Sequence, residues 1–143
     1  MKVIDADGRI IGRLASEIAR EARNGEEVRV VNSESAVVSG DREDVFEEYK
    51  QKVDRGSRDN GPYYPKSPDG ILKRTVKGML PDGDAGREAL SRVRAYLGVP
   101  DEFEEDLEQP DVKEGSDLKN RNYVKIGDVS EHVGWEASGG LYE

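Results

Sequence analysis

The chain has 143 residues, of which 37% are charged and 34% hydrophobic, and its formal net charge is −9. This length suits one compact domain, residues 1–143, with a core of its own. Because the chain has no cysteine, disulfides, thiolate nucleophiles and cysteine metal sites are excluded. Neither a signal peptide nor a run long enough for a membrane helix is visible, so we expect a soluble, intracellular protein.

Predicted strands and helices alternate through the first forty residues. Lys2–Ala6 is predicted to be a short strand, Val28–Val31 is typical of a buried strand, and Ala36–Ser39 is predicted to be extended. Between the first two strands, Gly12–Asn24 is predicted to be an amphipathic helix that ends at Asn24-Gly25. A strand–helix–strand series of this length favours a crossover unit, and therefore an α/β protein with a parallel sheet.

Two further helices are predicted before residue 82, with an irregular segment between them. Asp41 can cap the first, which carries Val45, Phe46, Tyr49 and Val53 at helical spacing. Gly56–Asp69 contains too many prolines and glycines for regular structure. Ile71–Met79 is predicted to be a short helix that Leu80-Pro81 ends.

The last third of the chain is predicted to hold a helix, an acidic segment and a short closing unit. Gly86–Leu97 is predicted to be helical, burying Ala89, Leu90 and Val93 with Tyr96 or Leu97. Residues 101–117 contain nine acidic residues and one lysine, which predicts an extended, solvated insertion. Tyr123–Ile126 is predicted to be a strand and Gly127–Val133 a helix, followed by a tail at 135–143.

One segment carries a net positive charge, opposite to that of the rest of the chain. Between Lys50 and Pro81 there are three acidic and eight basic residues, which are Lys50, Lys52, Arg55, Arg58, Lys66, Lys73, Arg74 and Lys77. This window is +5, so the remainder carries −14. Cations can neutralise phosphates, and Tyr63 and Tyr64 can stack on bases, so we expect a nucleic-acid surface rather than a solvated basic loop. Because neighbours in an extended segment point opposite ways, one of the two tyrosines can instead pack beneath the loop.

Two other places could carry chemistry. Gly8–Arg13 lies where a strand gives way to a helix, and it could hold an anion with Arg9 and Arg13 or be a plain turn. It lacks the pattern of a dinucleotide fingerprint or a P-loop. His132 is the only histidine and has no partners for a triad or a zinc site, so a surface or packing role is favoured.

Four segments of the chain resemble the large-subunit ribosomal protein L-thirteen family. They are GRIIGRLASEIA (Gly8–Ala19), VRVVNSESAVVSG (Val28–Gly40), NGPYYPKSPDGILKRTVKGMLP (Asn60–Pro81) and GREALSRVRAYLGVP (Gly86–Pro100). They occur in the order and with the spacing of the family. The most specific signal is Thr75–Pro81, which follows a basic loop rich in tyrosine and proline.

The resemblance implies a single three-layer α/β/α domain with a mainly parallel sheet of about four strands. A basic RNA-binding extension at 55–81 and an acidic loop at 101–117 would be added to it. The implied function is that of a structural constituent of the large ribosomal subunit in the cytoplasm, supporting assembly and translation without catalysis. The alternative is a small α/β nucleotide-binding protein or hydrolase that uses the Gly8–Arg13 turn.

The implied partners are large-subunit ribosomal RNA and neighbouring large-subunit proteins, with one copy per ribosome, no membrane and no small-molecule substrate. No cofactor or metal site is expected, apart from Mg²⁺ or K⁺ ions that belong to the RNA. The residues expected to bind ribosomal RNA are Arg9, Arg13, Arg55, Arg58, Tyr63, Tyr64, Lys66, Lys73, Arg74, Lys77 and Gly78.

The chain departs from the family pattern in its charge. The family is mostly basic and continues after Leu80-Pro81 with histidine, lysine and arginine, whereas this chain has Asp82–Ala85 and a pI near 4.8. An archaeal, halophilic origin would reconcile the two, because the Debye length is only ~3 Å at 1 M salt. Distant carboxylates then scarcely repel a phosphate.

Overall fold

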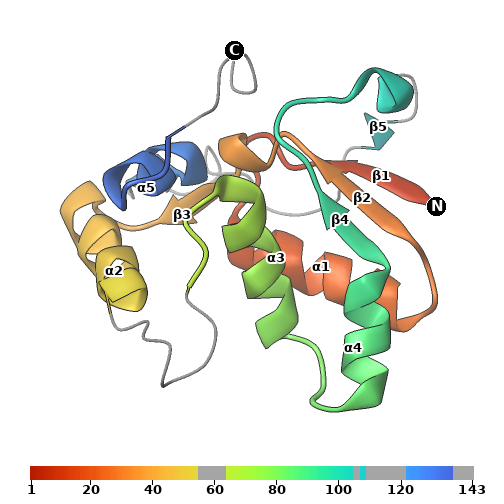
Figure 1. Cartoon of the computed structure of the whole chain (residues 1–143). Coiled ribbons are helices and arrows are strands. Elements are labelled where there is room, and N and C mark those ends of the chain that lie inside the picture. Colours follow the sequence, from red (N-terminus) through yellow and green to blue (C-terminus); the bar gives the residue numbers. More distant parts are fainter. Residues whose placement is uncertain (55–63, 105–106, 109–121, 137–143) are drawn as a thin grey trace.

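The computed structural model describes residues 1–54, 64–104, 107–108 and 122–136 (Figure 1). Strands and helices alternate along this part of the chain, as the sequence predicts for an α/β protein. The elements are β1 (Lys2–Asp5), α1 (Ile11–Arg23), β2 (Val28–Val31), η1 (Ser33–Ser35), β3 (Val37–Ser39), α2 (Arg42–Asp54), α3 (Pro68–Gly78), α4 (Asp84–Ser91), β4 (Val93–Ala95), η3 (Asp101–Phe103), β5 (Leu107–Glu108), β6 (Tyr123–Lys125) and α5 (Ile126–His132).

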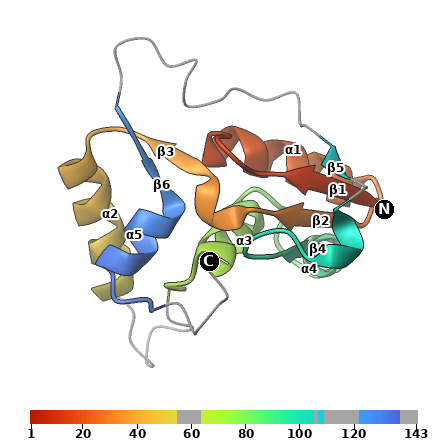
Figure 2. The same ribbon diagram turned by 90° about the horizontal axis from the view of Figure 1, so that it is seen from above.

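Four of these strands form one parallel sheet in the order β4-β2-β1-β5. β1 pairs with β2 from Lys2↔Val28 to Asp5↔Val31, and α1 is the crossover between them. The predicted class and the mainly parallel sheet are therefore confirmed. β3 and β6 pair antiparallel in a separate small sheet, and α2 and α5 lie beside it (Figure 2).

α1 forms where the apolar periodicity predicts it. Its buried residues recur three and four positions apart, so they share one face of the helix; they are Ile11, Leu14, Ala15, Ile18, Ala19 and Ala22. The helix ends at Arg23 with Asn24 as its C-cap, and Gly25 follows with φ +93°, a conformation that favours glycine.

The core lies mainly on one face of the parallel sheet. Ile4, Val28 and Val30 point to this face, and they form one buried cluster with apolar residues of α1, α3 and α4. The same cluster continues into α2 and α5. On the opposite face, Val3 and Val31 pack against Phe103 of η3. The sheet therefore lies between a main helical layer and the short η3 segment.

The predicted boundaries of α3 need correction at the N-terminus. α3 begins at Pro68 and not at Ile71, because Ser67 caps it: the Ser67 hydroxyl accepts a hydrogen bond from the Gly70 amide at 3.3 Å. Proline costs nothing in the first turn of a helix, where its missing amide would have no intrahelical partner. Of the predicted irregular segment Gly56–Asp69, residues 64–67 form neither helix nor strand, as predicted, and residues 56–63 lie outside the described residues.

The prediction of a helix over Gly86–Leu97 is wrong in its second half. α4 ends at Ser91, and Val93–Ala95 form β4, which pairs with β2 from Val28↔Val93 to Val30↔Ala95. Val93 is buried as predicted, but in a strand. A partner strand more than sixty residues away supplies the backbone hydrogen bonds, and local helical spacing carries no sign of it.

The acidic segment is more ordered at its start than predicted. Residues 101–103 form η3, and Phe103 is buried. Leu107–Glu108 form β5, which pairs with β1 at Val3↔Leu107. Phe103 and Leu107 are apolar residues in an acidic run, and covering the second face of the sheet buries both of them at least partly. The remainder, 105–106 and 109–117, lies outside the described residues, as does the tail from 137.

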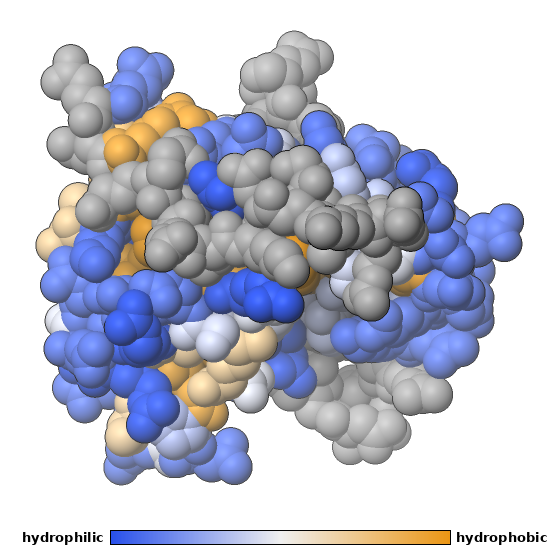
Figure 3. All heavy atoms as spheres, turned by 180° about the vertical axis from the view of Figure 1, so that it is seen from behind, coloured by the Kyte–Doolittle hydropathy of each residue, from blue (hydrophilic) through white to orange (hydrophobic). Residues whose placement is uncertain are grey.

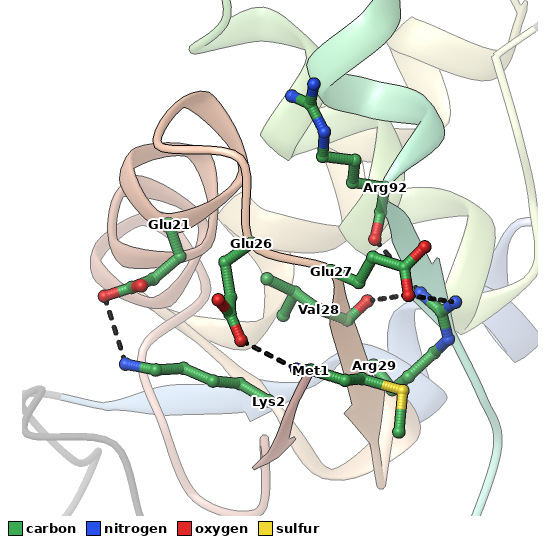
Figure 4. A network of polar contacts seen from close by, with 8 residues as sticks. All are labelled: Met1, Lys2, Glu21, Glu26, Glu27, Val28, Arg29 and Arg92. Carbon is green, nitrogen blue, oxygen red and sulfur yellow. Dashed lines mark hydrogen bonds and ion pairs between the residues drawn. The ribbon is translucent and has the colours of Figure 1, made fainter.

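Charged residues connect the amino ends of β1 and β2 with α1 and α4 (Figure 4). The Met1 ammonium lies 2.9 Å from the Glu26 carboxylate, and Lys2 lies 3.3 Å from Glu21 of α1. Arg29 donates to the Arg92 carbonyl at 3.0 Å. The ion pairs to Glu21 and Glu26 are partly exposed, so each contributes little to stability.

On the face seen from behind, the described residues are mainly hydrophilic, with smaller apolar areas (Figure 3). Among the described helices, none is long and apolar enough to cross a membrane.

Candidate nucleic-acid interface

α3 has one buried face and one basic face. Ile71, Leu72 and Val76 are fully buried, whereas Arg74 and Lys77 are exposed and Lys73 is half-buried. Because residues three apart lie on the same side of a helix, Arg74 and Lys77 point together into solvent. The core thus fixes the direction in which α3 displays its cations.

A groove of about 440 Å³ lies between α3 and α4. Arg74, Lys77 and Gly78 line it from α3, and Asp82 and Arg87 line it from the following turn and α4. We call it the α3–α4 groove. Its polar lining mixes three cations with one carboxylate, so its local charge is positive within a protein that is negative overall.

The close approach of α4 to the end of α3 depends on Gly86. A Cβ on Gly86 would lie 1.7 Å from the carbonyl oxygen of Pro81, closer than any real contact. The turn between the helices also contains Gly83 with φ +94°. Arg87 forms a 2.7 Å ion pair with Asp84, and both side chains are exposed, so the pair is weak.

A second hollow, of about 380 Å³, opens next to the α3–α4 groove. Its lining residues are Lys52 of α2, Tyr64, and Arg74, Thr75 and Gly78 of α3. We call it the Lys52–Arg74 hollow. Arg74 and Gly78 line both depressions. The two therefore form one continuous basic surface that runs across α3.

Two tyrosines support the cations of this hollow. Tyr49 and Tyr64 meet edge to face, with ring centroids 6.3 Å apart. Lys52 Nζ lies 4.6 Å from the Tyr49 centroid and 5.7 Å from that of Tyr64, and the Arg74 guanidinium lies 6.0 Å from the Tyr64 centroid. Burial raises the pKa of both phenols, and for Tyr64 the charge of Arg74 opposes that rise. Both rings stay neutral at physiological pH and present their negative faces to the cations.

The structure brings four of the predicted RNA-binding residues together: Tyr64, Arg74, Lys77 and Gly78 line the groove or the hollow. Lys73 and Lys66 line neither. Lys66 is exposed and lies beside Gly134, where an added Cβ would be 3.8 Å from its Nζ. Arg55, Arg58 and Tyr63 lie outside the described residues.

The Gly8–Arg13 turn is held by backbone hydrogen bonds. The Gly8 amide donates to the Ser35 carbonyl at 2.9 Å, and the Arg9 amide donates to Ala6 at 3.0 Å. These two amides are therefore not available to an anion. Arg9 is half-buried and Arg13 exposed, and neither lines the groove or the hollow.

His132 has a packing role, as the sequence favours. Its ring stacks on Phe46 at 4.3 Å with an interplanar angle of 15°, and Arg42 lies 4.6 Å from the same phenylalanine centroid. This stack joins α5 to α2. Within the described ranges, no three acidic, histidine or cysteine residues are grouped so as to hold a metal ion.

Two cations of this surface were not among the predicted binding residues. Lys52 lies in the basic window and Arg87 in the Gly86–Pro100 motif, so both had a signal in the sequence. For Lys52, the sequence does not show how α2 packs: its Tyr49 meets Tyr64, and Lys52, three residues further along the helix, lines the hollow.

Comparison with known proteins agrees with the architecture. The family model described as Ribosomal protein L13 matches residues 1–102. A relative from Methanococcoides burtonii is 49% identical over 94% of this chain and 98% of its own length. Relatives from Archaeoglobus fulgidus and Haloarcula marismortui are each 47% identical, over 93% and 92% of this chain and 87% and 90% of their own lengths. All three are named large ribosomal subunit protein uL13. The chain belongs to the ribosomal protein L13 family.

Proposed function

We propose that this chain is a structural constituent of the large ribosomal subunit in the cytoplasm, where it binds ribosomal RNA and supports subunit assembly and translation. Its relatives carry the name of a large-subunit protein, and they match nearly the whole chain. One copy per subunit would contact RNA on the face of α3 and neighbouring large-subunit proteins elsewhere.

The observation that carries this proposal is the basic surface across α3. Arg74 and Lys77 are exposed on a helix whose other face is fully buried, so their directions are fixed before RNA arrives. Gly78 adds no side chain where the groove and the hollow meet, and a Cβ there would touch nothing within 4 Å. A nucleic-acid backbone can therefore come close to α3.

We further propose that the protein catalyses no reaction and needs no cofactor of its own, with Mg²⁺ or K⁺ ions bound to the RNA nearby. The rival nucleotide-binding function has fewer donors to use in the Gly8–Arg13 turn, because the amides of Gly8 and Arg9 are bonded to backbone carbonyls. Phosphate neutralisation by side chains on a rigid face is a positioning role and needs no reacting group.

The test is a charge-removing double variant, Arg74→Gln/Lys77→Gln, compared with the matched control Lys50→Gln/Lys125→Gln. Each lost phosphate contact removes a counterion-release contribution, so the first variant should bind large-subunit ribosomal RNA about 10-fold or more weakly. All four side chains are exposed, so the melting temperatures should stay close to that of the unchanged protein.

The proposal fails if the unchanged protein does not co-sediment with large subunits. It also fails if Arg74→Gln/Lys77→Gln binds the RNA as tightly as the control variant Lys50→Gln/Lys125→Gln. An Arg74→Gln/Lys77→Gln protein that unfolds but still enters subunits would show that these residues are structural. Saturable binding of ATP in place of RNA would favour the nucleotide-binding alternative.

A further inference from the structure

We infer that Lys52 and Arg74 jointly bind one RNA phosphate in the Lys52–Arg74 hollow, and that the Tyr49–Tyr64 pair holds the two cations in position. The inference rests on the proposed function and adds to it a binding residue on α2. It also gives Tyr64 a positioning role in place of base stacking.

The first support is the convergence of two cations from different elements. Lys52 Nζ and the Arg74 guanidinium both lie over the ring of Tyr64, at 5.7 and 6.0 Å from its centroid. Both side chains also line the same hollow, so their positive charges act on one opening and attract an anion to it. The negative faces of the tyrosine rings hold the two cations at the hollow, where a phosphate can contact both.

The second support is the weakness of the acidic partner already present. Glu48 lies 3.5 Å from Lys52 Nζ at an i,i+4 spacing, and 59% of its side chain is exposed. Exposed pairs of this kind contribute little, and they are screened further in salt. Lys52 can therefore exchange the Glu48 carboxylate for a phosphate at small cost.

The third support is the lining of the hollow. The Thr75 hydroxyl donates its hydrogen to the Ile71 carbonyl at 2.9 Å, so the attractive contacts for an anion come from the two cations. Open space around the α-carbon of Gly78 lets a backbone approach between them. Burial raises the pKa of Tyr64, so its phenol adds no competing negative charge.

The same contacts explain why Tyr64 is not proposed as a stacking surface for a base. Its ring is half-buried, the Tyr49 ring meets it edge to face, and both cations already lie over it. A base would have to displace a cation to stack there. The pair therefore acts as a support for the cations rather than as a free aromatic platform.

The experiment measures the affinity of the full chain for large-subunit ribosomal RNA of Haloarcula marismortui over a series of KCl concentrations. Lys52→Gln/Arg74→Gln should bind about 10-fold more weakly. Its slope of log affinity against log salt should be shallower by ~0.7–0.9, the value for one phosphate. Lys50→Gln, on the exposed face of the same helix, should leave affinity and slope unchanged.

Tyr64 is tested by a double-mutant cycle. Tyr64→Leu should weaken binding about 3- to 10-fold in the unchanged protein, although it removes no charge, and should have no further effect in Lys52→Gln/Arg74→Gln. Tyr64→Phe keeps the ring and should bind like the unchanged protein. A merely structural role would give the same loss in both backgrounds, and it would lower the melting temperature of both.

Three outcomes would overturn the inference while leaving the proposed function intact. In the first, Lys52→Gln weakens RNA binding no more than Lys50→Gln does. In the second, the salt slope of Lys52→Gln/Arg74→Gln changes by about twice the value for one phosphate. In the third, Tyr64→Leu still weakens RNA binding when Lys52 and Arg74 are both replaced. If the unchanged protein binds large-subunit RNA no better than small-subunit RNA, the proposed function itself fails.

Discussion

The contact between Gly86 and Pro81 allows a quantitative test of the α3–α4 turn. Replacing Gly86 with alanine places a Cβ 1.7 Å from the Pro81 carbonyl oxygen and 2.9 Å from its carbonyl carbon. Both partners are backbone atoms, so no flexible side chain can move aside. The first turn of α4 must shift away from Pro81, and the α3–α4 groove must change shape with it.

Two effects of opposite sign decide the stability of Gly86→Ala. Alanine in a helix is favoured over glycine by up to ~1 kcal/mol. Forcing an extra carbon into a closed contact costs ~1–3 kcal/mol, and more when backbone must move. The second effect wins, so we expect a net loss of about 2 kcal/mol. For a chain of this length, that lowers the melting temperature by roughly 5–10 °C.

The matched control is Gly12→Ala in α1, where an added Cβ meets nothing within 4 Å. This variant should melt at the same temperature as the unchanged protein or slightly above it, because only the helix preference changes. Both variants would be followed by circular dichroism in molar KCl. If Gly86→Ala melts as high as Gly12→Ala, the close approach of α4 to Pro81 does not exist.

Three further predictions concern salt, the second face of the sheet and the Asp82 turn. The −14 charge outside the basic window should make the protein melt higher in molar KCl than in dilute buffer, and equal melting in both would argue against a halophilic origin. Phe103→Ala should lower the free energy of unfolding in denaturant by ~3–5 kcal/mol and leave RNA affinity unchanged. A negligible loss of stability would mean that Phe103 is solvated, as the acidic segment was predicted to be. Asp82→Lys replaces the carboxylate of the α3–α4 groove with a cation, so it should strengthen RNA binding about 3- to 10-fold with little change in stability. Unchanged affinity would mean that the RNA does not approach this turn.

Elements with strong local signals were predictable from the sequence. α1 has an apolar stripe over thirteen residues and a glycine terminator, and the structure places it within one residue of the prediction. β4 had no comparable signal, because three residues following a helix become a strand only by pairing with β2. The start of α3 is harder to predict, because the proline-rich stretch before it favours a loop although Ser67 and Pro68 are standard N-terminal signals of a helix.

In the candidate site, too, some features follow from local sequence patterns and others depend on tertiary packing. The exposed positions of Arg74 and Lys77 follow from the helical period of Ile71, Leu72 and Val76, which the sequence displays. The part played by Lys52 does not follow from any local pattern. It depends on tertiary packing, in which Tyr49 of α2 meets Tyr64 across fifteen residues of chain.

The pairing of β5 with β1 has a consequence for the order of folding. Val3 and Leu107 are about 100 residues apart, and only two residue pairs join their strands. Closing so long a loop for so few hydrogen bonds is entropically expensive, so β5 should dock last and detach first. Until residues 107–108 leave the synthesising ribosome, one edge of β1 with its Val3 and Ile4 side chains is an unpaired template for other strands. Nascent chains that stall before Leu107 should therefore be the species most prone to aggregate.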